Sequence, residues 1–154
     1  MRTDCEVVEW AHEESGEARC GDARLTKRLG LLLTRLGQSP GMSIPQACNG
    51  RHAEIAAAYR FFDNPSATPE NILGAHRQQS LMRMAEHSTV LLVQDTTEMD
   101  MSQPRRRIHG AGPLDDSPRQ GAFVHLMHAF TMEGTPLGSV WHKLLVRAPR
   151  PEDT

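Results

Sequence analysis

Long apolar runs are missing from this sequence of 154 residues. None approaches the roughly 20 residues that a membrane-spanning helix needs. No apolar signal core follows the first residues, so we expect neither a membrane protein nor a secreted one. Cysteine is scarce: Cys5, Cys20 and Cys48 are scattered, and their spacing matches no metal-binding motif. In a reducing cytosol they are most simply free thiols.

Internal repeats and low-complexity tracts are also absent. Hydrophobic residues make up 38% of the chain and charged residues 23%, which is enough for a packed core and argues against disorder. The 12 glycines and 10 prolines indicate many breaks between short elements. The length suits one ordinary domain, or one small domain followed by the start of another.

Net charge is small, at −2, but the charges are separated along the chain. Residues 1–18 contain six acids and one base, whereas residues 19–60 contain seven bases and two acids. A locally basic segment in a nearly neutral chain indicates a polyanionic partner. The bases of this segment are Arg19, Arg24, Lys27, Arg28, Arg35, Arg51 and Arg60.

Five helices are predicted before residue 88, each from a capping residue or a turn followed by apolar residues at helical spacing. Their expected ranges are 4–17, 23–36, 43–48, 51–63 and 69–86, with Asp4, Asp22, Ser43 and Thr68 at the starts. The residues expected to face inward are Val7, Val8 and Ala11 in the first helix, Ile55, Ala56, Tyr59 and Phe62 in the fourth, and Ile72, Leu73 and Met84 in the fifth.

The second predicted helix has the clearest periodicity. One face carries Leu25, Leu29, Leu32, Leu33 and Leu36, and the nearly opposite face carries Arg24, Lys27, Arg28 and Arg35. Leu31 falls among the bases and breaks the pattern. The basic face either contacts phosphates, each contact releasing a counterion, or is a solvated helix face.

Strands are predicted after residue 88. A buried strand is expected at 89–94, ended by Asp95, and a hairpin of strands at 122–132 and 137–146 completes an antiparallel meander. The loop between them contains Arg105, Arg106 and Arg107, which have the same two interpretations as the basic helix face. Because no helix follows to cover the sheet, we expect a chain that has been cut short.

Asp95 is the main candidate for chemistry. A carboxylate just past a buried strand is well placed to hold a divalent cation, although from spacing alone the simpler interpretation is that Asp95 caps a turn. Glu98 and Asp100 lie near it in sequence, without a pattern that makes a joint site. His125 and His128 are three apart on a predicted strand and should face opposite sides, so we expect no shared metal.

Five motifs occur in a distinctive order, from about Trp10 to Arg147. Together the ordered set resembles the N-terminal part of bacterial DDE cut-and-paste transposases of the IS-four type, to which the Tn-five transposase belongs. The motifs are CGDARLTKRL at 20–29, SIPQAC at 43–48, AAYRFFDNP at 57–65, VQDTT at 93–97 and GTPLG at 134–138.

The resemblance implies a mixed α and β fold in two parts. Residues 1–88 would form a helical transposon-end-binding domain, and residues 89–154 the first strand and hairpin of a truncated ribonuclease H-like catalytic domain. The implied function is DNA transposition, a form of DNA recombination, with double-stranded inverted-repeat ends of a mobile element as the DNA partner. A second copy or a full-length transposase is the implied protein partner, in the cytoplasm of a bacterium and associated with its nucleoid.

The resemblance also assigns residues. Asp95 matches the first Asp of the catalytic triad, which holds Mg²⁺ or Mn²⁺, and Arg60 matches an arginine that contacts end DNA. The other DNA-binding candidates are Arg24, Lys27, Arg28, Arg35 and Arg51. Tyr59 is expected to serve packing rather than base stacking.

The second Asp and the Glu of the triad have no counterpart in these 154 residues. Two-metal phosphoryl transfer needs several carboxylates, so we do not expect this chain alone to hold the metals or to cleave DNA. A non-catalytic DNA-binding or inhibitory module therefore stays open as an alternative function. A small metal-dependent hydrolase that uses Asp95 and histidines is the least favoured interpretation.

Overall fold

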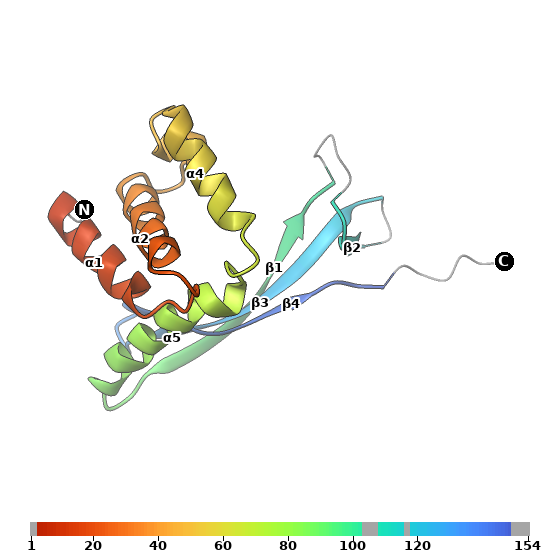
Figure 1. The fold of residues 1–154 in the computed structure, drawn as a ribbon. Helices are drawn as coiled ribbons and strands as arrows, with labels where there is room; N and C mark the ends of the chain where they lie inside the picture. The colour runs from red at the N-terminus through yellow and green to blue at the C-terminus, as the bar shows by residue number, and fades with distance from the viewer. Residues whose placement is uncertain (1–2, 103–107, 116–117, 149–154) are drawn as a thin grey trace. The chain divides into compact units, whose positions relative to one another are not determined.

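The computed structural model describes residues 3–102, 108–115 and 118–148, in which helices precede strands (Figure 1). Contacts divide the chain into two compact units, residues 1–82 and residues 83–154. The division lies inside the last helix, a few residues before the boundary at residue 88 that the sequence suggested. The fold is thus a mixed one, with helices followed by an antiparallel sheet.

The five predicted helices are all present, and their ends lie within two residues of the predicted ones. They are α1 (Asp4–Gly16), α2 (Ala23–Gln38), α3 (Ile44–Ala47), α4 (His52–Phe62) and α5 (Pro69–Ala85). Asp22 caps α2 as expected, because its side chain accepts a hydrogen bond from the amide of Arg24 at 2.7 Å. The start of α1 differs, since Thr3 rather than Asp4 is the cap and forms a capping box with Glu6.

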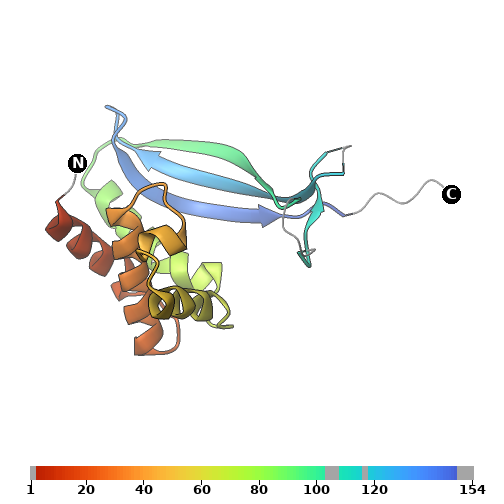
Figure 2. The same cartoon turned by 90° about the horizontal axis from the view of Figure 1, so that it is seen from above.

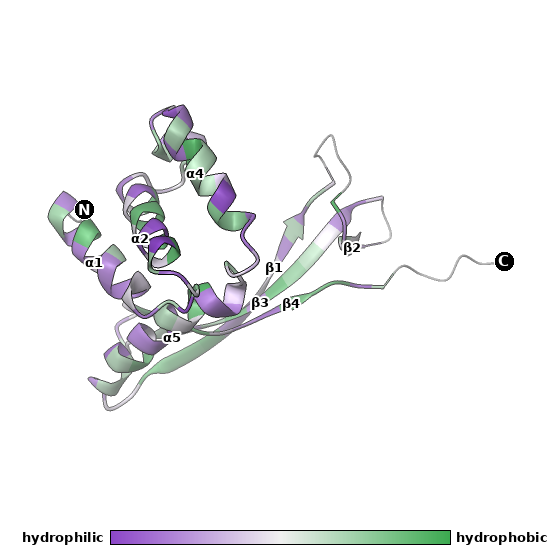
Figure 3. Ribbon diagram, viewed as in Figure 1, coloured by the Kyte–Doolittle hydropathy of each residue, from purple (hydrophilic) through white to green (hydrophobic). Residues whose placement is uncertain are grey.

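The core of the helical unit uses the predicted leucine face of α2. Leu29 and Leu32 are buried, and Leu25 and Leu33 pack at the edge of the same cluster. The other buried members are Ala18, Cys20, Ala58, Phe61 and Ala75. Each helix combines hydrophobic and hydrophilic residues, as Figure 3 shows, so the stability of these short helices comes from packing their apolar faces together.

The inward face of α1 was predicted in part, and that of α4 was predicted wrongly. On α1, Val7 and Ala11 are buried, but Val8 is half exposed. On α4, the buried residues are Ala58 and Phe61, whereas Ala56, Tyr59 and Phe62 are exposed. The α4 sequence is apolar around most of its circumference, and a shift of one residue turns a helix by about 100°, so spacing alone does not fix which face packs.

Small residues let α1 approach α2 closely. A Cβ atom on Gly37 would lie 2.9 Å from Val7 Cγ1 and 3.2 Å from Trp10 Cζ3. On Gly30 it would lie 2.9 Å from Ser15 Oγ, whose hydroxyl is already donated to the carbonyl of Ala11. These two glycines, seven residues apart, are therefore the positions at which α1 packs closely against α2.

We expect Gly37→Ala to lower the stability of the helical unit by about 1–2 kcal/mol. The added methyl overpacks the stiff Val7 side chain, at a cost that exceeds the gain of about 1 kcal/mol in helix propensity. The matched control is Gly74→Ala in α5, where the added methyl meets nothing within 4 Å and should stabilise by about 0.5–1 kcal/mol. Urea unfolding, followed by circular dichroism, checks that the two variants change the free energy of unfolding in opposite directions. Equal changes would contradict the close packing of α1 on α2 at Gly37.

The second unit is an antiparallel sheet, and its three long strands lie side by side (Figure 2). Its strands are β1 (Leu91–Asp100), β2 (Gly112–Pro113), β3 (Gln120–Phe130) and β4 (Pro136–Leu145). β3 pairs with β1 and with β4 along its length, while β2 pairs only with its first residues. This arrangement confirms the predicted meander, and a turn in which the amide of Gly134 donates to the carbonyl of Thr131 joins β3 to β4.

The first strand differs from its prediction in two respects. It does not end at Asp95 but continues to Asp100, because β3 offers partners along the whole stretch, from Phe130 opposite Leu91 to Gly121 opposite Asp100. It is also exposed at every residue rather than buried. Neighbouring Leu92 and Val93 point to opposite faces of the sheet, and both are about half exposed.

Arg119 holds three carboxylates next to the start of β3. Its guanidinium contacts Glu98 at 2.8 Å, Asp115 at 2.9 Å and Asp100 at 3.1 Å. Hydrogen bonds from Ser102, followed by that from Arg119, lower the pKa of Asp100 to about 2. The acids of this part of the sheet are thus occupied by one arginine.

We expect the Asp100 carboxyl to titrate near pH 2 in an NMR titration, well below its usual value of about 3.9. Since the folded pKa is the lower one, the stabilisation from ionised Asp100 is present above about pH 4 and is lost as the pH falls toward 2. Ser102→Ala and Arg119→Gln should each raise this pKa. An unchanged titration in both variants would contradict the assignment.

Candidate nucleic-acid interface

Arg24 stands at the start of α2, beside the cap. Its guanidinium contacts Asp22 through Nη2 at 2.8 Å and Nε at 3.1 Å, and its side chain is 91% exposed. These hydrogen bonds lower the pKa of Asp22 and raise the pKa of Arg24. Asp22 therefore both caps the helix and orients the arginine, whose Nη1 group is left facing water.

Arg28 and Arg35 turn toward α4 instead of into solvent. Both contact the same oxygen of Glu54, at 3.4 Å for Arg28 Nη1 and 3.2 Å for Arg35 Nη2. The predicted basic face of α2 is therefore divided, with Arg24 and Lys27 outside and these two arginines at the seam between α2 and α4. The division arises because α4 packs along that side of α2 and brings a carboxylate with it.

Lys27 lies on the wall of a groove between α1 and α2. The groove has a volume of about 850 Å³, and Val8, His12 and Leu31 also line it. Lys27 forms no hydrogen bond or ion pair with the described residues, so its ammonium group is available to a ligand. Leu31, which broke the periodicity of α2, is exposed and lines this groove, so it is not a core residue.

The outward face of α4 is exposed and has an arginine at each end of the helix. Arg51 immediately precedes the helix and Arg60 lies in its last turn; both are exposed, and neither has a partner among the described residues. Between them Ala56 and Tyr59 point outward, and Tyr59 is 49% exposed. The expectation that Tyr59 packs in the core was thus wrong. An exposed helix with an arginine at each end suits the major groove of DNA, which is wide enough to admit an α-helix.

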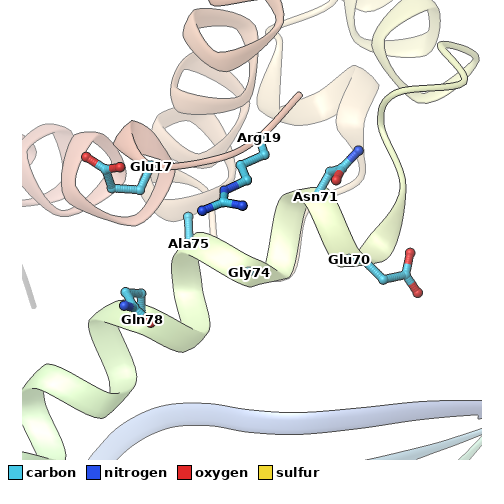
Figure 4. A pocket seen from close by; sticks show the side chains of 7 residues that line it. All are labelled: Glu17, Arg19, Glu70, Asn71, Gly74, Ala75 and Gln78. Carbon is cyan, nitrogen blue, oxygen red and sulfur yellow. The ribbon is translucent and has the colours of Figure 1, made fainter. Parts of the chain in front are cut away.

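A second pocket lies where the link after α1 meets α5. It has a volume of about 360 Å³, and Figure 4 shows Arg19 reaching over α5 between Glu17 and Asn71. Glu70 and Gln78 complete its polar wall. Two carboxylates and one guanidinium make this pocket net negative, so it does not suit a polyanion, and Arg19 stands apart from the cations of α2 and α4.

Asp95 sits in the middle of β1. It pairs with Leu126 on β3, which pairs in turn with His142 on β4, and its Oδ1 accepts a hydrogen bond from the amide of Thr96 at 2.7 Å. Glu98 and Asp100 project from the opposite face of the strand, where Arg119 binds them. No joint site of Asp95 with these two acids is formed.

The resemblance implied a cation site at Asp95. Within the described ranges, no group of three or more His, Cys, Asp or Glu side chains is placed to hold a metal ion. Asp95 supplies one carboxylate, so the described residues alone do not make up the two-cation site that the resemblance implied.

The predicted histidine and arginine features have separate outcomes. His125 and His128 face opposite sides of β3, as predicted: His125 meets Thr96 at 2.7 Å and His128 meets Ser139 at 2.9 Å. The run Arg105 to Arg107 lies outside the described residues.

Sequence reasoning missed two contacts between helices. One joins Glu14 on α1 to His76 on α5, with Oε2 2.7 Å from Nδ1. The other joins Glu54 on α4 to Arg28 and Arg35 on α2. This contact had a signal in the sequence, because Glu54 is the only acid in residues 23–62 and shares a helical face with Ala58 and Phe61. A lone acid on an apolar face of a helix, within a basic segment, indicates a partner among the bases.

Among the described helices, none has the length and hydropathy of a membrane span. Residues 8–67 match the family model described as transposase DNA-binding. The matched stretch covers most of α1 and all of α2, α3 and α4, and it contains all six DNA-binding candidates. The match supports a transposase N-terminus, with DNA as its partner and DNA binding in transposition as its role.

Proposed function

We propose that this chain recognises the inverted-repeat ends of a mobile element as the DNA-binding part of an IS-four type transposase. The observation that carries the proposal is the position of the six candidate cations. All lie within the stretch that matches the transposase DNA-binding family, on α2 or α4 or directly at the start of α4.

The cations take different parts in this proposal. Lys27, Arg51 and Arg60 have no partner among the described residues and contact phosphates directly. Arg24 contacts a phosphate with the side of its guanidinium that Asp22 leaves exposed. Phosphate contacts fix the position of the protein on the duplex but do not read sequence, so we assign sequence reading to the outward face of α4 around Ala56 and Tyr59.

Salt dependence tests this proposal most directly. If four or five positive charges neutralise phosphates, the slope of log Kd against log salt concentration should be about 3.6 to 4.5. Fluorescence anisotropy with the full chain would use two duplexes of equal length, one with the inverted repeat that flanks the reading frame and one with its bases scrambled. We expect tighter binding to the repeat and the same steep slope for both. Absence of binding to either duplex at about 50 mM salt would overturn the proposal.

The strand unit has a role in the same proposal. Three antiparallel strands in meander order are compatible with the opening of a ribonuclease H-like sheet, and Asp95 would be one carboxylate ligand of a Mg²⁺ or Mn²⁺ site there. Its remaining ligands are not among the described residues, so we derive no catalytic step. Among the residues that the structure describes, no other carboxylate joins Asp95 in a metal-binding group. This favours the second candidate, a module that binds DNA ends without cleaving them and competes with a full-length transposase.

A further inference from the structure

Glu54 sits between two arginines of the α2–α4 seam. Its Oε2 lies 3.4 Å from Arg28 Nη1 and 3.2 Å from Arg35 Nη2. The side chains are partly buried, with 32% exposure for Arg28, 20% for Arg35 and 32% for Glu54. They are enclosed enough to be held in place and open enough for a phosphate to approach.

The three side chains do not neutralise one another. Two guanidinium groups and one carboxylate leave a net charge of +1, and Nε of Arg35 is buried without an acceptor among the described residues. Since no other acid occurs in residues 23–62, nothing else on α2, α3 or α4 offsets this charge. Solvent and salt screen partly buried charges less than exposed ones.

We propose that Glu54 is a positioning residue and internal counter-ion, which limits the Arg28–Glu54–Arg35 cluster to one net phosphate contact. This inference rests on the proposed DNA binding. In the free protein the carboxylate holds both guanidinium groups at the seam, and it stays between them when a phosphate binds. The cluster therefore contributes one phosphate contact, not two, to the sequence-independent part of the DNA affinity. Base recognition by α4 then accounts for a larger share of the total affinity.

The net charge of the cluster distinguishes this role of Glu54 from a purely structural one. Each net charge facing phosphates adds about 0.9 to the salt slope, which corresponds to about 8-fold in affinity at 0.1 M salt. The net charge of the cluster is +1 in the natural chain, +2 in Glu54→Gln and 0 in Arg28→Gln. It is +1 again in the double variant, which combines Glu54→Gln with Arg28→Gln. A structural role for Glu54 predicts weaker binding in Glu54→Gln and no restoration in the double variant.

The experiment measures the salt slope of the full chain on the scrambled duplex. We expect Glu54→Gln to bind about 8-fold more tightly at 0.1 M salt with a slope steeper by about 0.9, and Arg28→Gln to show the opposite changes. The double variant should return to the natural slope. The control is Glu13→Gln, which removes one exposed acid from α1 and should leave the slope unchanged.

One further variant, Glu54→Asp, retains the charge and should keep the natural slope. Arg28→Gln tests the net charge of the cluster even if Glu54→Gln fails to fold. A natural chain that binds DNA while Glu54→Gln has an unchanged or shallower slope would overturn the inference alone. A natural chain that binds no duplex would overturn both the proposed function and the inference.

Discussion

Replacing Lys27, Arg51 and Arg60 together with glutamine is expected to weaken binding to duplex DNA by about 10²- to 10³-fold at 0.1 M salt. Each lost phosphate contact removes about 0.9 from the salt slope, so the slope should fall by about 2.7. These three cations are chosen because none has a partner among the described residues, whereas Asp22 holds Arg24 and Glu54 holds Arg28. Fluorescence anisotropy over a salt series measures both quantities.

A control with the same change in net charge separates a defined surface from general electrostatic attraction. Arg19, Arg77 and Lys143 are exposed cations outside the proposed interface. Their combined replacement with glutamine should change the affinity less than about 5-fold, because distant exposed charges are screened by salt. Equal losses in the two triple variants would show that DNA binds to overall charge and not to α2 and α4. Thermal melting of both variants verifies that they remain folded.

Local signals made the helical unit predictable. Asp22 and Ser43 have the side chains that cap helices, and the turns around Gly21 and Gly41 interrupt the periodic segments. The leucines of α2 repeat at helical spacing over the whole helix, which leaves only one way to bury them. Both the ends of the helices and the core face of α2 therefore follow from short-range chemistry.

Long-range packing decided the features that were predicted wrongly. The burial of a strand depends on what covers it, and the apolar run before Asp95 has the composition of a buried strand although it is exposed in the structure. Its length depends on β3, which continues the pairing to Asp100. Likewise, the spacing of the bases predicted the basic face of α2. It could not predict that α4 packs there and places Glu54 against Arg28 and Arg35.

The adjacent phenylalanines of α4 provide the sharpest test of the helical core. Phe61 is 1% exposed and belongs to the central cluster, whereas its neighbour Phe62 is 50% exposed. We expect Phe61→Ala to destabilise the helical unit by about 3–5 kcal/mol, through lost apolar burial and the cavity left behind. A loss of this size is a large part of the 5–15 kcal/mol that stabilises an ordinary domain. Urea unfolding of the full chain, followed by far-UV circular dichroism, gives the free energy.

Phe62→Ala is the matched control, since it removes the same atoms one position along the same helix. The two rings meet edge to face, with centroids 5.3 Å apart. Losing that contact and half a ring of burial should cost about 1 kcal/mol. The order of the two effects reports the rotation of α4 about its axis. If Phe62→Ala proved the more damaging, α4 would be turned by about one residue, and Tyr59 with Arg60 would no longer share the face proposed to meet DNA.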